Sequence, residues 1–282
     1  MVVYEDLLSL DKLYNVYKNI CSTTKHKAKL IKFELSFSCN MIQILHILKQ
    51  EKYHHGRYSL FLISTPKYRL IMSENIQDKI INHLISQYIL LPALTPKLIN
   101  TNVATRKDMG TKAAILYMKK YINYLKFRYD KIYILKCDIC KYFYNIDHDI
   151  LLKKLNRDIE DKRLQTLLKE VVCSTDYPYI NDRIKLLIQQ EVERMRLKTV
   201  TNKKALIKKL YQIPFYTSGK GLPIGNETSQ ILAIYYLSEL DHFIKEQLHI
   251  RCYIRYMDDF ILIHHNRNYL QECLIRIKEK LN

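Results

Sequence analysis

Two acidic sites, each at the end of an apolar run, constrain the fold of this chain more than any other feature of its sequence. Asp138 closes the strand-like run Lys131–Asp138, and the pair Asp258-Asp259 lies at the tip of a predicted hairpin. The long segment between the two sites reads mostly as helix, so the strands that end in these acids are able to lie side by side in one sheet. The sequence therefore predicts an α+β fold whose sheet joins strands that are distant along the chain.

Acids in this arrangement have two interpretations. Asp is a favoured turn residue, so an acidic pair in a hairpin is often a solvated loop and nothing more. Carboxylates at adjacent strand ends also hold two divalent cations about 3.5–4 Å apart, the arrangement used for in-line phosphoryl transfer. Mg²⁺ suits such a site because it binds a few carboxylates together with phosphate oxygens of the substrate.

The remaining elements follow from apolar periodicity and from turn residues. Pro92 is expected to end the helix before it, and Pro66 favours a turn over Ser64–Lys67. The very basic segment Tyr177–Phe215 reads as mostly helical without an obvious core face, which predicts an insertion on the surface. Helices are expected within Met1–Gln50 and over Glu74–Leu91, Thr111–Phe127, Ile150–Cys173, Glu227–Gln247 and Gln271–Leu281, and strands over Tyr58–Ile63, Tyr68–Met72, Lys131–Asp138, Arg251–Tyr256 and Phe260–His264.

The balance of charge narrows the class of partner. The chain carries 46 Lys and Arg against 28 Asp and Glu, a net charge of +18. Such an excess points to a polyanion such as nucleic acid, although a lysine-rich background would give the same excess. No run reaches the ~18–20 uncharged apolar residues of a membrane-spanning helix, and the N-terminus lacks the pattern of a signal peptide. We therefore expect no membrane partner.

Seven cysteines, an odd and scattered set, indicate reduced thiols in a cytoplasmic protein. Cys137 and Cys140 form a C-x-x-C spacing, but a zinc site needs a second pair of ligands, and the sequence contains no second pair with such spacing. The two residues lie in an apolar run, where Cys behaves as a small buried hydrophobe. A metal or redox role for this pair is not expected.

Five short motifs resemble those of one known family. Tyr256–Phe260, with the sequence YMDDF, resembles the YxDD box of reverse transcriptases. The stretch KCDICKYFYNIDHDIL resembles the first catalytic box of that family, in which an aromatic residue follows the Asp by five positions, here Phe143 after Asp138. Three further motifs stand in family order: Thr65–Ile71 resembles the fingers motif that grips the triphosphate, Ala104–Ile115 the next fingers block, and Gly219–Gln230 the loop and helix beneath the nascent base pair.

The resemblance implies a right-hand polymerase with fingers and a ferredoxin-like palm sheet. Residues 1–130 would form N-terminal helices and fingers, and residues 131–282 the palm, with a basic helical insertion at about 177–215. The chain ends within the fourth palm motif, so the family's thumb is expected to be absent from it. The implied activity is RNA-directed DNA synthesis with two Mg²⁺ ions, for which Mn²⁺ is a substitute. The implied partners are an RNA template, a DNA product and deoxynucleoside triphosphates, together with an accessory protein or further subunits.

The family's site residues carry over position by position. Asp138 and Asp258 would be the principal metal ligands, and the Ile139 carbonyl an additional one. Asp259 would be a weaker ligand or an electrostatic support. Phe143 would exclude a 2′-hydroxyl, with core packing as its alternative role. The nucleotide-binding set is Lys67, Arg69, Phe143, Ile224, Gly225 and Gln230, and the template and primer set is Arg106, Lys107, Tyr256 and Met257; solvated surface charge is the alternative role of the basic residues in both sets.

The sequence of the loop before the apolar helix indicates which subfamily the chain resembles. Ile224–Gln230 has an I-G-x-x-x-S-Q pattern, which resembles the reverse transcriptases of diversity-generating retroelements. An error-prone enzyme of a bacterial or phage retroelement is therefore expected. The alternatives are a phage-defence-associated reverse transcriptase, a group II intron or retron type of enzyme, a non-catalytic RNA-binding protein, and a nucleotide cyclase with a palm fold.

Overall fold

The computed structural model describes residues 2–24, 27–65, 67–106, 108–197 and 202–281. They form two compact units, and each unit is built from two segments of the chain. The first unit comprises Met1–Ala93 and Phe143–Ser229, and the second comprises Leu94–Tyr142 and Gln230–Asn282. These limits differ from a single division at residue 130, because the chain leaves the first unit and returns to it. The names fingers and palm stay predictions.

Helices open the first unit. They are η1 (Tyr4–Leu7), α1 (Leu10–Thr23), α2 (Ala28–Glu34), α3 (Phe37–Lys49) and α4 (Ile76–Ile85). Helix α1 begins at Ser9, whose side chain accepts a hydrogen bond from the backbone of Lys12. Its buried residues Leu13, Val16 and Ile20 lie three and four positions apart on the face that meets α3 and α4. The prediction of helices within Met1–Gln50 is confirmed.

Pro92 does not end the helix before it, so that prediction is wrong. Helix α4 continues into a π-helical turn, η2 (Ser86–Leu90), and then into α5 (Leu91–Leu94), which contains the proline; η3 (Thr95–Lys97) follows. Proline has no N–H to donate to the carbonyl four residues earlier. A π turn just before it replaces that pattern with bonds that span five residues, and the chain continues as helix.

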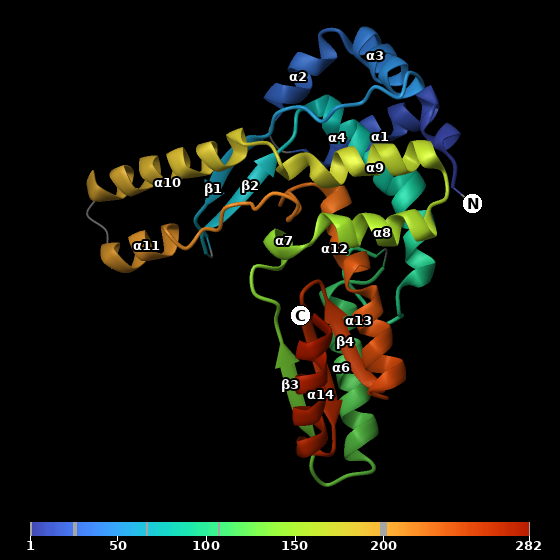
Figure 1. Cartoon of the computed structure of the whole chain (residues 1–282), viewed down its shortest axis with the longest axis vertical. Helices are drawn as coiled ribbons and strands as arrows, with labels where there is room; N and C mark the ends of the chain where they lie inside the picture. The colour runs from blue at the N-terminus through green and yellow to red at the C-terminus, as the bar shows by residue number, and fades with distance from the viewer. Residues whose placement is uncertain (1, 25–26, 66, 107, 198–201, 282) are drawn as a thin grey trace. The chain divides into compact units, whose positions relative to one another are not determined.

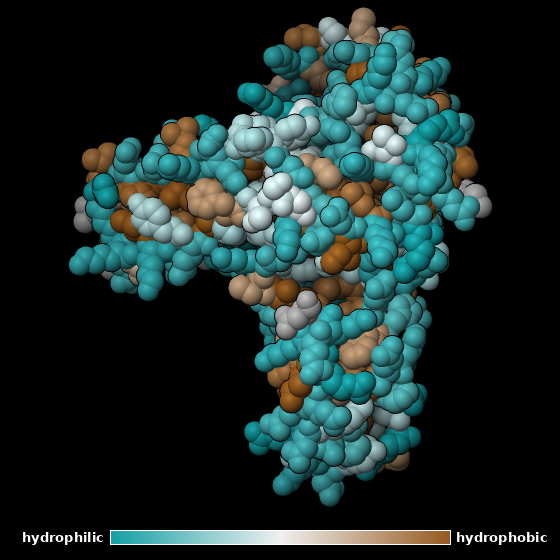
Figure 2. All heavy atoms as spheres, in the orientation of Figure 1, coloured by the Kyte–Doolittle hydropathy of each residue, from teal (hydrophilic) through white to brown (hydrophobic). Residues whose placement is uncertain are grey.

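The basic segment Tyr177–Phe215 has a core face, contrary to the prediction. Its helices α10 (Tyr179–Leu197) and α11 (Lys203–Leu210) pack together, and α10 contacts β1 of the antiparallel hairpin β1 (Ser59–Ile63) and β2 (Arg69–Ser73), as Figure 1 shows. Hydrophobic side chains gather between α10 and α11 on the face seen in Figure 2. The buried residues of this cluster are Tyr58, Leu60, Leu70, Met72, Ile180, Ile184, Ile188, Val192, Met195, Leu210, Ile213 and Tyr216.

The segment predicted as one helix over Ile150–Cys173 forms two. Helix α8 (His148–Asp158) begins after the cap Asp147, and α9 (Lys162–Val172) begins after the cap Asp161, whose carboxylate accepts the backbone N–H groups of Arg163 and Leu164. The short helices α7 (Tyr142–Asn145) and η4 (Cys173–Thr175) flank this pair.

The second unit is built on a three-stranded antiparallel sheet in the order β3–β5–β4. The strands are β3 (Tyr133–Cys137), β4 (Cys252–Tyr256) and β5 (Asp259–His264), and the helices are α6 (Thr111–Lys126), α12 (Glu227–Tyr236, which starts in the first unit), α13 (Ser238–His242), the π turn η5 (Phe243–Gln247) and α14 (Arg267–Leu281). Strand β3 lies at the edge and is only half-buried, whereas the sequence predicts a buried strand. Helix α6 covers the face that carries Cys252 and Ile263.

No helix among the described residues is both long enough and apolar enough to cross a bilayer.

Candidate active site

The two acidic sites lie at the same end of the sheet in the second unit. Cys137 pairs with Phe260 and Tyr256 pairs with Asp259, so Asp138, the residue after Cys137, lies beside the hairpin that joins β4 to β5. Asp138 and Asp259 are exposed and Asp258 is half-buried. The expectation that these distant strands meet at their acidic ends is confirmed. Ile139 follows directly and is half-buried.

The hairpin that carries Asp258 is tight and strained. Its loop consists of two residues, Met257 and Asp258, and Met257 has φ +56°, a region that side chains with a Cβ rarely adopt. The Met257 side chain packs against Leu98, Ala104 and Ile234. Tyr256, at the end of β4, is 41% exposed. Such strain persists only where the surroundings hold it.

A buried ion pair stabilises the strained hairpin. The guanidinium of Arg255 is fully buried, and its Nε and Nη2 donate to the two carboxylate oxygens of Asp241 at 2.7 and 2.6 Å. Its Nη1 donates to the carbonyl of Met257 at 2.8 Å, which ties the ion pair to the acidic loop. Burial lowers the pKa of Arg255, but the Asp241 carboxylate outweighs burial and holds that pKa above its ordinary value. Sequence reasoning missed both residues; an Arg inside an apolar strand was the available signal.

The segment before α6 lies along β4. Arg255 donates its backbone N–H to Thr101, and Val103 donates to Arg255, both at 3.0 Å. Arg106 Nη1 donates to the carbonyls of Ile99 and Asn102 at 3.0 and 3.2 Å, so this side chain has a structural role in the loop. A template contact for Arg106 stays a prediction. Lys107, predicted for the same task, lies outside the described residues.

The predicted nucleotide-binding residues, except Gln230, lie in the first unit. Lys67 and Arg69 are both exposed, but β2 begins at Arg69, so Lys67 precedes the strand and does not share a strand face with Arg69 as predicted. Pro66 lies outside the described residues. Phe143 is half-buried, and its carbonyl accepts from Leu222 at 2.8 Å. Gln230 lies on α12 and is exposed.

The loop that contains Ile224 and Gly225 is fixed against β2. The Ile224 carbonyl accepts the backbone N–H of Met72 at 2.9 Å. Gly225 has φ +138°, and a Cβ at this position would lie 2.6 Å from the Met72 carbonyl oxygen. Glycine is therefore required here for both its backbone conformation and its small size.

We expect Gly225→Ala to lower the free energy of unfolding by about 1–3 kcal/mol, because the added methyl group displaces the loop from β2. Gly110→Ala is the matched control: Gly110 has φ +97°, but no atom lies within 4 Å of its added Cβ. Urea unfolding of both variants separates backbone strain from the close approach. Equal losses in the two variants would contradict the requirement for contact with Met72.

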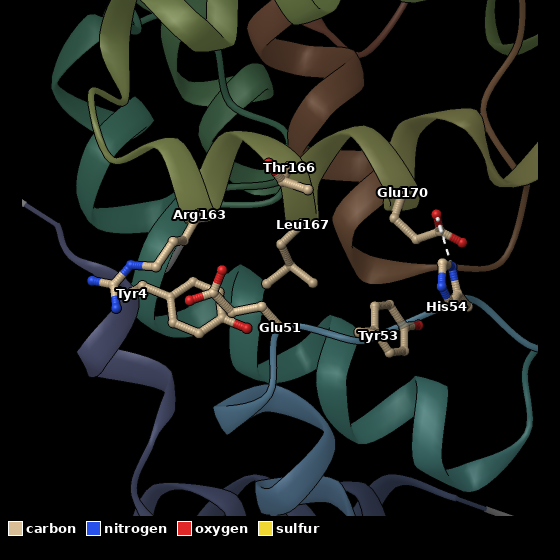
Figure 3. A pocket seen from close by; sticks show the side chains of 8 residues that line it. All are labelled: Tyr4, Glu51, Tyr53, His54, Arg163, Thr166, Leu167 and Glu170. Carbon is tan, nitrogen blue, oxygen red and sulfur yellow. Dashed lines mark ion pairs between the residues drawn. The ribbon is translucent and has the colours of Figure 1, made fainter.

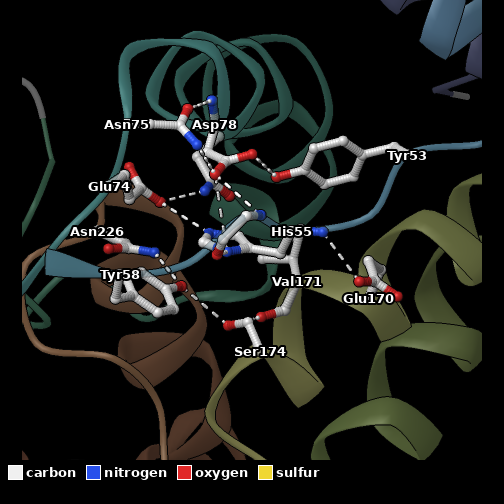
Figure 4. A network of polar contacts seen from close by, with 12 residues as sticks. Tyr53, His55, Tyr58, Glu74, Asn75, Asp78, Glu170, Val171, Ser174 and Asn226 are labelled. Atoms are coloured by element: carbon white, nitrogen blue, oxygen red, sulfur yellow. Dashed lines mark hydrogen bonds and ion pairs between the residues drawn. The ribbon is translucent and has the colours of Figure 1, made fainter. Parts of the chain in front are cut away.

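A buried polar network that sequence reasoning missed also holds this loop (Figure 4). Asn226 donates to the Tyr58 hydroxyl at 2.9 Å, and Tyr58 is bonded to Ser174 at 3.0 Å. On the other side, Thr228 donates to Asn82 at 3.2 Å, and Asn82 donates to Glu74. The network thus connects Asn226, at the end of the loop, and Thr228, at the start of α12, to buried residues of the first unit.

His55 lies at the centre of this network. Its Nδ1 donates to the Gly56 carbonyl at 2.7 Å, and its Nε2 lies 3.5 Å from the Glu74 carboxylate. Burial lowers the pKa of His55, but the carboxylates of Glu74 and Asp78 and the Gly56 carbonyl together raise it above its ordinary value. Burial raises the pKa of Glu74.

These pKa directions predict a pH dependence. A histidine whose pKa is raised in the folded chain stabilises that chain fully below its unfolded pKa of about 6.5, and the contribution is lost as pH rises through the folded pKa. We expect the urea concentration at the midpoint of wild-type unfolding to decrease as pH rises from about 6.5 into the alkaline range. His55→Gln should show a smaller fall over the same range. Parallel pH profiles of the two proteins would contradict a charged His55.

A cavity of about 90 Å³ lies elsewhere in the first unit (Figure 3). It is lined by Tyr4, Glu51, Tyr53, His54, Arg163, Thr166, Leu167 and Glu170, and the His54 and Glu170 side chains form an ion pair at 3.5 Å. None of the predicted site residues lines this cavity within the described part of the chain.

A comparison with models of protein families identifies the family of this chain. Residues 48–282 match the family model described as reverse transcriptase (RNA-dependent DNA polymerase). The chain belongs to the reverse transcriptase family. The match covers all five motifs and most of the sequence. A comparison with curated proteins finds no match.

Two solved structures show a distant similarity to this chain. A telomerase from Candida albicans, solved with the TWJ fragment of telomeric RNA, has a TM-score of 0.42 and 13% identity over 80% of this chain and 40% of its own. An apo telomerase from Candida tropicalis, truncated from its C-terminal domain, has a TM-score of 0.41 and 14% identity over 85% of this chain and 51% of its own. This chain thus spans about half or less of the length of either protein.

Reverse transcriptases generally use divalent metal ions, usually Mg²⁺. The acidic end of the sheet offers three carboxylates, those of Asp138, Asp258 and Asp259, on adjacent strands. Carboxylate oxygen is the donor type that Mg²⁺ prefers, so the residues present fit such an ion in kind.

Proposed function

We propose that this chain is an RNA-directed DNA polymerase whose catalytic metal ligands are Asp138 and Asp258. The observation that carries the proposal is the placement of two acidic sites, distant in sequence, at one end of a single sheet in a chain of the reverse transcriptase family. Neither acid is deeply buried, so phosphate oxygens and metal ions have access to both. Asp259 supports them electrostatically.

Asp138 and Asp258 would hold the metal ions, with Asp259 as an electrostatic support, and bound ions would supply activation of the primer 3′-hydroxyl and neutralisation of the pyrophosphate leaving group. No side chain serves as a nucleophile, because the attacking group belongs to the primer. The protein's part is to fix the carboxylates, and the bond from Arg255 to the Met257 carbonyl fixes the loop that carries Asp258.

The exposed basic side chains of Lys67 and Arg69 supply positive charge for the triphosphate, and Arg is able to bind phosphate oxygens in pairs. Phe143 provides the bulk that disfavours a 2′-hydroxyl. The net charge of +18 suits a template and a product that are both polyanions.

Primer extension by the full chain tests the function. We expect deoxynucleotide incorporation on an RNA template with Mg²⁺, and its loss when EDTA is added. Incorporation that is independent of template sequence would favour the untemplated synthesis of a defence-type enzyme, and cyclic nucleotide formation would favour a cyclase. RNA binding without either reaction would contradict the polymerase assignment.

We further propose an error-prone enzyme of a bacterial or phage retroelement, of the diversity-generating type. The I-G-x-x-x-S-Q pattern of Ile224–Gln230 supports this. The Ile224 side chain has neither donor nor acceptor, whereas a glutamine here would offer both.

Ile224→Gln is expected to lower the misincorporation frequency by about tenfold to a hundredfold, the equivalent of one polar contact of about 1–3 kcal/mol. The backbone bond from Met72 to the Ile224 carbonyl does not involve the side chain, so the loop is expected to keep its position. Sequencing of complementary DNA from both proteins measures the effect. An unchanged error spectrum would exclude Ile224 as a determinant of fidelity.

A further inference from the structure

A cluster of three potential metal ligands lies in the first unit, apart from the acids of the sheet. His148 is the first residue of α8, Cys173 is the first residue of η4, and Asp176 follows η4. One ligand atom from each side chain lies within 4.8 Å of the other two. His148 is buried, Cys173 is half-buried and the Asp176 side chain is 30% exposed. None of these residues has a part in the polymerase chemistry proposed above.

The hydrogen bonds of His148 leave one ring nitrogen directed at the cluster. Nε2 lies 2.7 Å from the Gly221 carbonyl, which only accepts, so Nε2 carries the proton. Nδ1 is fully buried and lies 3.3 Å from Asp176 Oδ2, but among the described residues it makes no hydrogen bond of acceptable geometry. A histidine that ligates a metal typically donates its other N–H to a backbone carbonyl in this way.

The spacing of the ligand atoms fits a tetrahedral zinc ion. With Zn–N and Zn–O bonds of about 2.0–2.1 Å, two ligands at the tetrahedral angle lie about 3.3 Å apart. The observed separation of His148 Nδ1 and Asp176 Oδ2 is 3.3 Å. The same geometry requires sulfur about 3.6 Å from the other two ligand atoms, and the Cys173 sulfur lies within 4.8 Å of both.

Hydrogen bonds to neighbouring backbone groups help to fix the positions of the cluster residues. Asp176 Oδ1 accepts the backbone N–H of Gly219 at 2.9 Å, which leaves Oδ2 for the cluster. Thr175 donates to the Gly221 carbonyl at 2.7 Å, the same oxygen that His148 contacts. One carboxylate and one thiolate would together neutralise a divalent cation, and a thiolate ligand selects Zn²⁺ over Mg²⁺.

We propose that His148, Cys173 and Asp176 form a zinc site with an open fourth position for water. Bound zinc would link the start of α8, the end of α9 and the loop around Gly221, and so stabilise the segment that follows the first catalytic box. Burial raises the pKa of the Cys173 thiol, and the Asp176 carboxylate raises it further. Binding therefore replaces the thiol proton with the metal, and one proton is released to solvent. Without metal, the alternative is a direct pairing of His148 Nδ1 with Asp176 Oδ2 at 3.3 Å.

The full chain, stripped of metal with a chelator and kept in excess Mg²⁺ to occupy the acids of the sheet, is titrated with Zn²⁺ and separately with Co²⁺. We expect one tightly bound Zn²⁺ per chain, a rise in the thermal midpoint, and a thiolate-to-cobalt charge-transfer band. Cys173→Ser should abolish the band, and His148→Gln and Asp176→Asn should weaken Zn²⁺ binding by at least about tenfold.

Cys39→Ser is the matched control, because Cys39 is exposed and outside the cluster; it should retain the band and the affinity. Circular dichroism shows which variants fold, and Asp176→Asn, at the most exposed ligand, is the variant expected to fold most readily. Absence of stoichiometric zinc binding by the wild type, or binding unchanged in Cys173→Ser and Asp176→Asn, would overturn the proposal and leave the direct His148–Asp176 pairing.

Discussion

Replacing Asp258 or Asp138 with asparagine should reduce nucleotide incorporation by at least about a thousandfold, the equivalent of about 4 kcal/mol in the activation barrier. Asparagine keeps the size of the side chain but removes the negative charge that holds a divalent ion. Both acids lie at the same end of the sheet, so loss of either disrupts the same metal site. Asp259→Asn should have a smaller effect, because its assigned role is electrostatic.

Asp130→Asn is the control for this experiment. Asp130 is exposed and precedes β3, so it lies near the opposite end of the strand from Asp138. The Asp130→Asn protein should have the same activity as the wild type in single-turnover primer extension. Urea unfolding should show that all variants are folded. Activity of Asp138→Asn or Asp258→Asn within about tenfold of the wild type would rule out the two-metal assignment.

Arg255→Met should lower the free energy of unfolding by about 3–5 kcal/mol, because it leaves the carboxylate of Asp241 buried without its partner. Methionine retains much of the length of the side chain, so the loss reports on charge and hydrogen bonding. The variant also loses the bond to the Met257 carbonyl, so the folded fraction should have impaired incorporation as well. The urea midpoint and the activity per folded molecule measure the two effects separately.

The double variant Arg255→Met with Asp241→Leu should recover part of the lost stability, because no unpaired charge then remains buried. Arg251→Met is the control: Arg251 is exposed just before β4, where it contacts the Tyr124 hydroxyl at 3.1 Å, and its loss should cost much less. An Arg255→Met protein as stable as the control would show that the buried pair does not hold the hairpin.

Much of the local structure was predictable because it depends on residues close together in the chain. Short β-rich runs located β1, β2, β4 and β5, and three-and-four spacing located α1 and α6. The acids were found because Asp138 directly follows β3 and the pair Asp258-Asp259 lies at the turn between β4 and β5. Two strands with acids at the same end are able to share a metal. The family motifs then predicted the reverse transcriptase family, which the match over residues 48–282 shows.

Only the tertiary structure decided which elements pack against each other and which buried charges are paired. Periodicity within Tyr177–Phe215 did not indicate a core, because the hairpin of β1 and β2 that α10 covers lies far away in sequence. Strand β3 is apolar yet half-exposed, whereas β4, at the other edge of the same sheet, is almost wholly buried, so the burial of each strand depends on the elements that pack against it. Arg255 with Asp241, and His55 with Glu74, are charges whose cost of burial is offset only by groups brought from other elements. A sequence pattern reports how a segment folds locally, whereas the energy of a buried charge depends on the groups that the completed fold places around it.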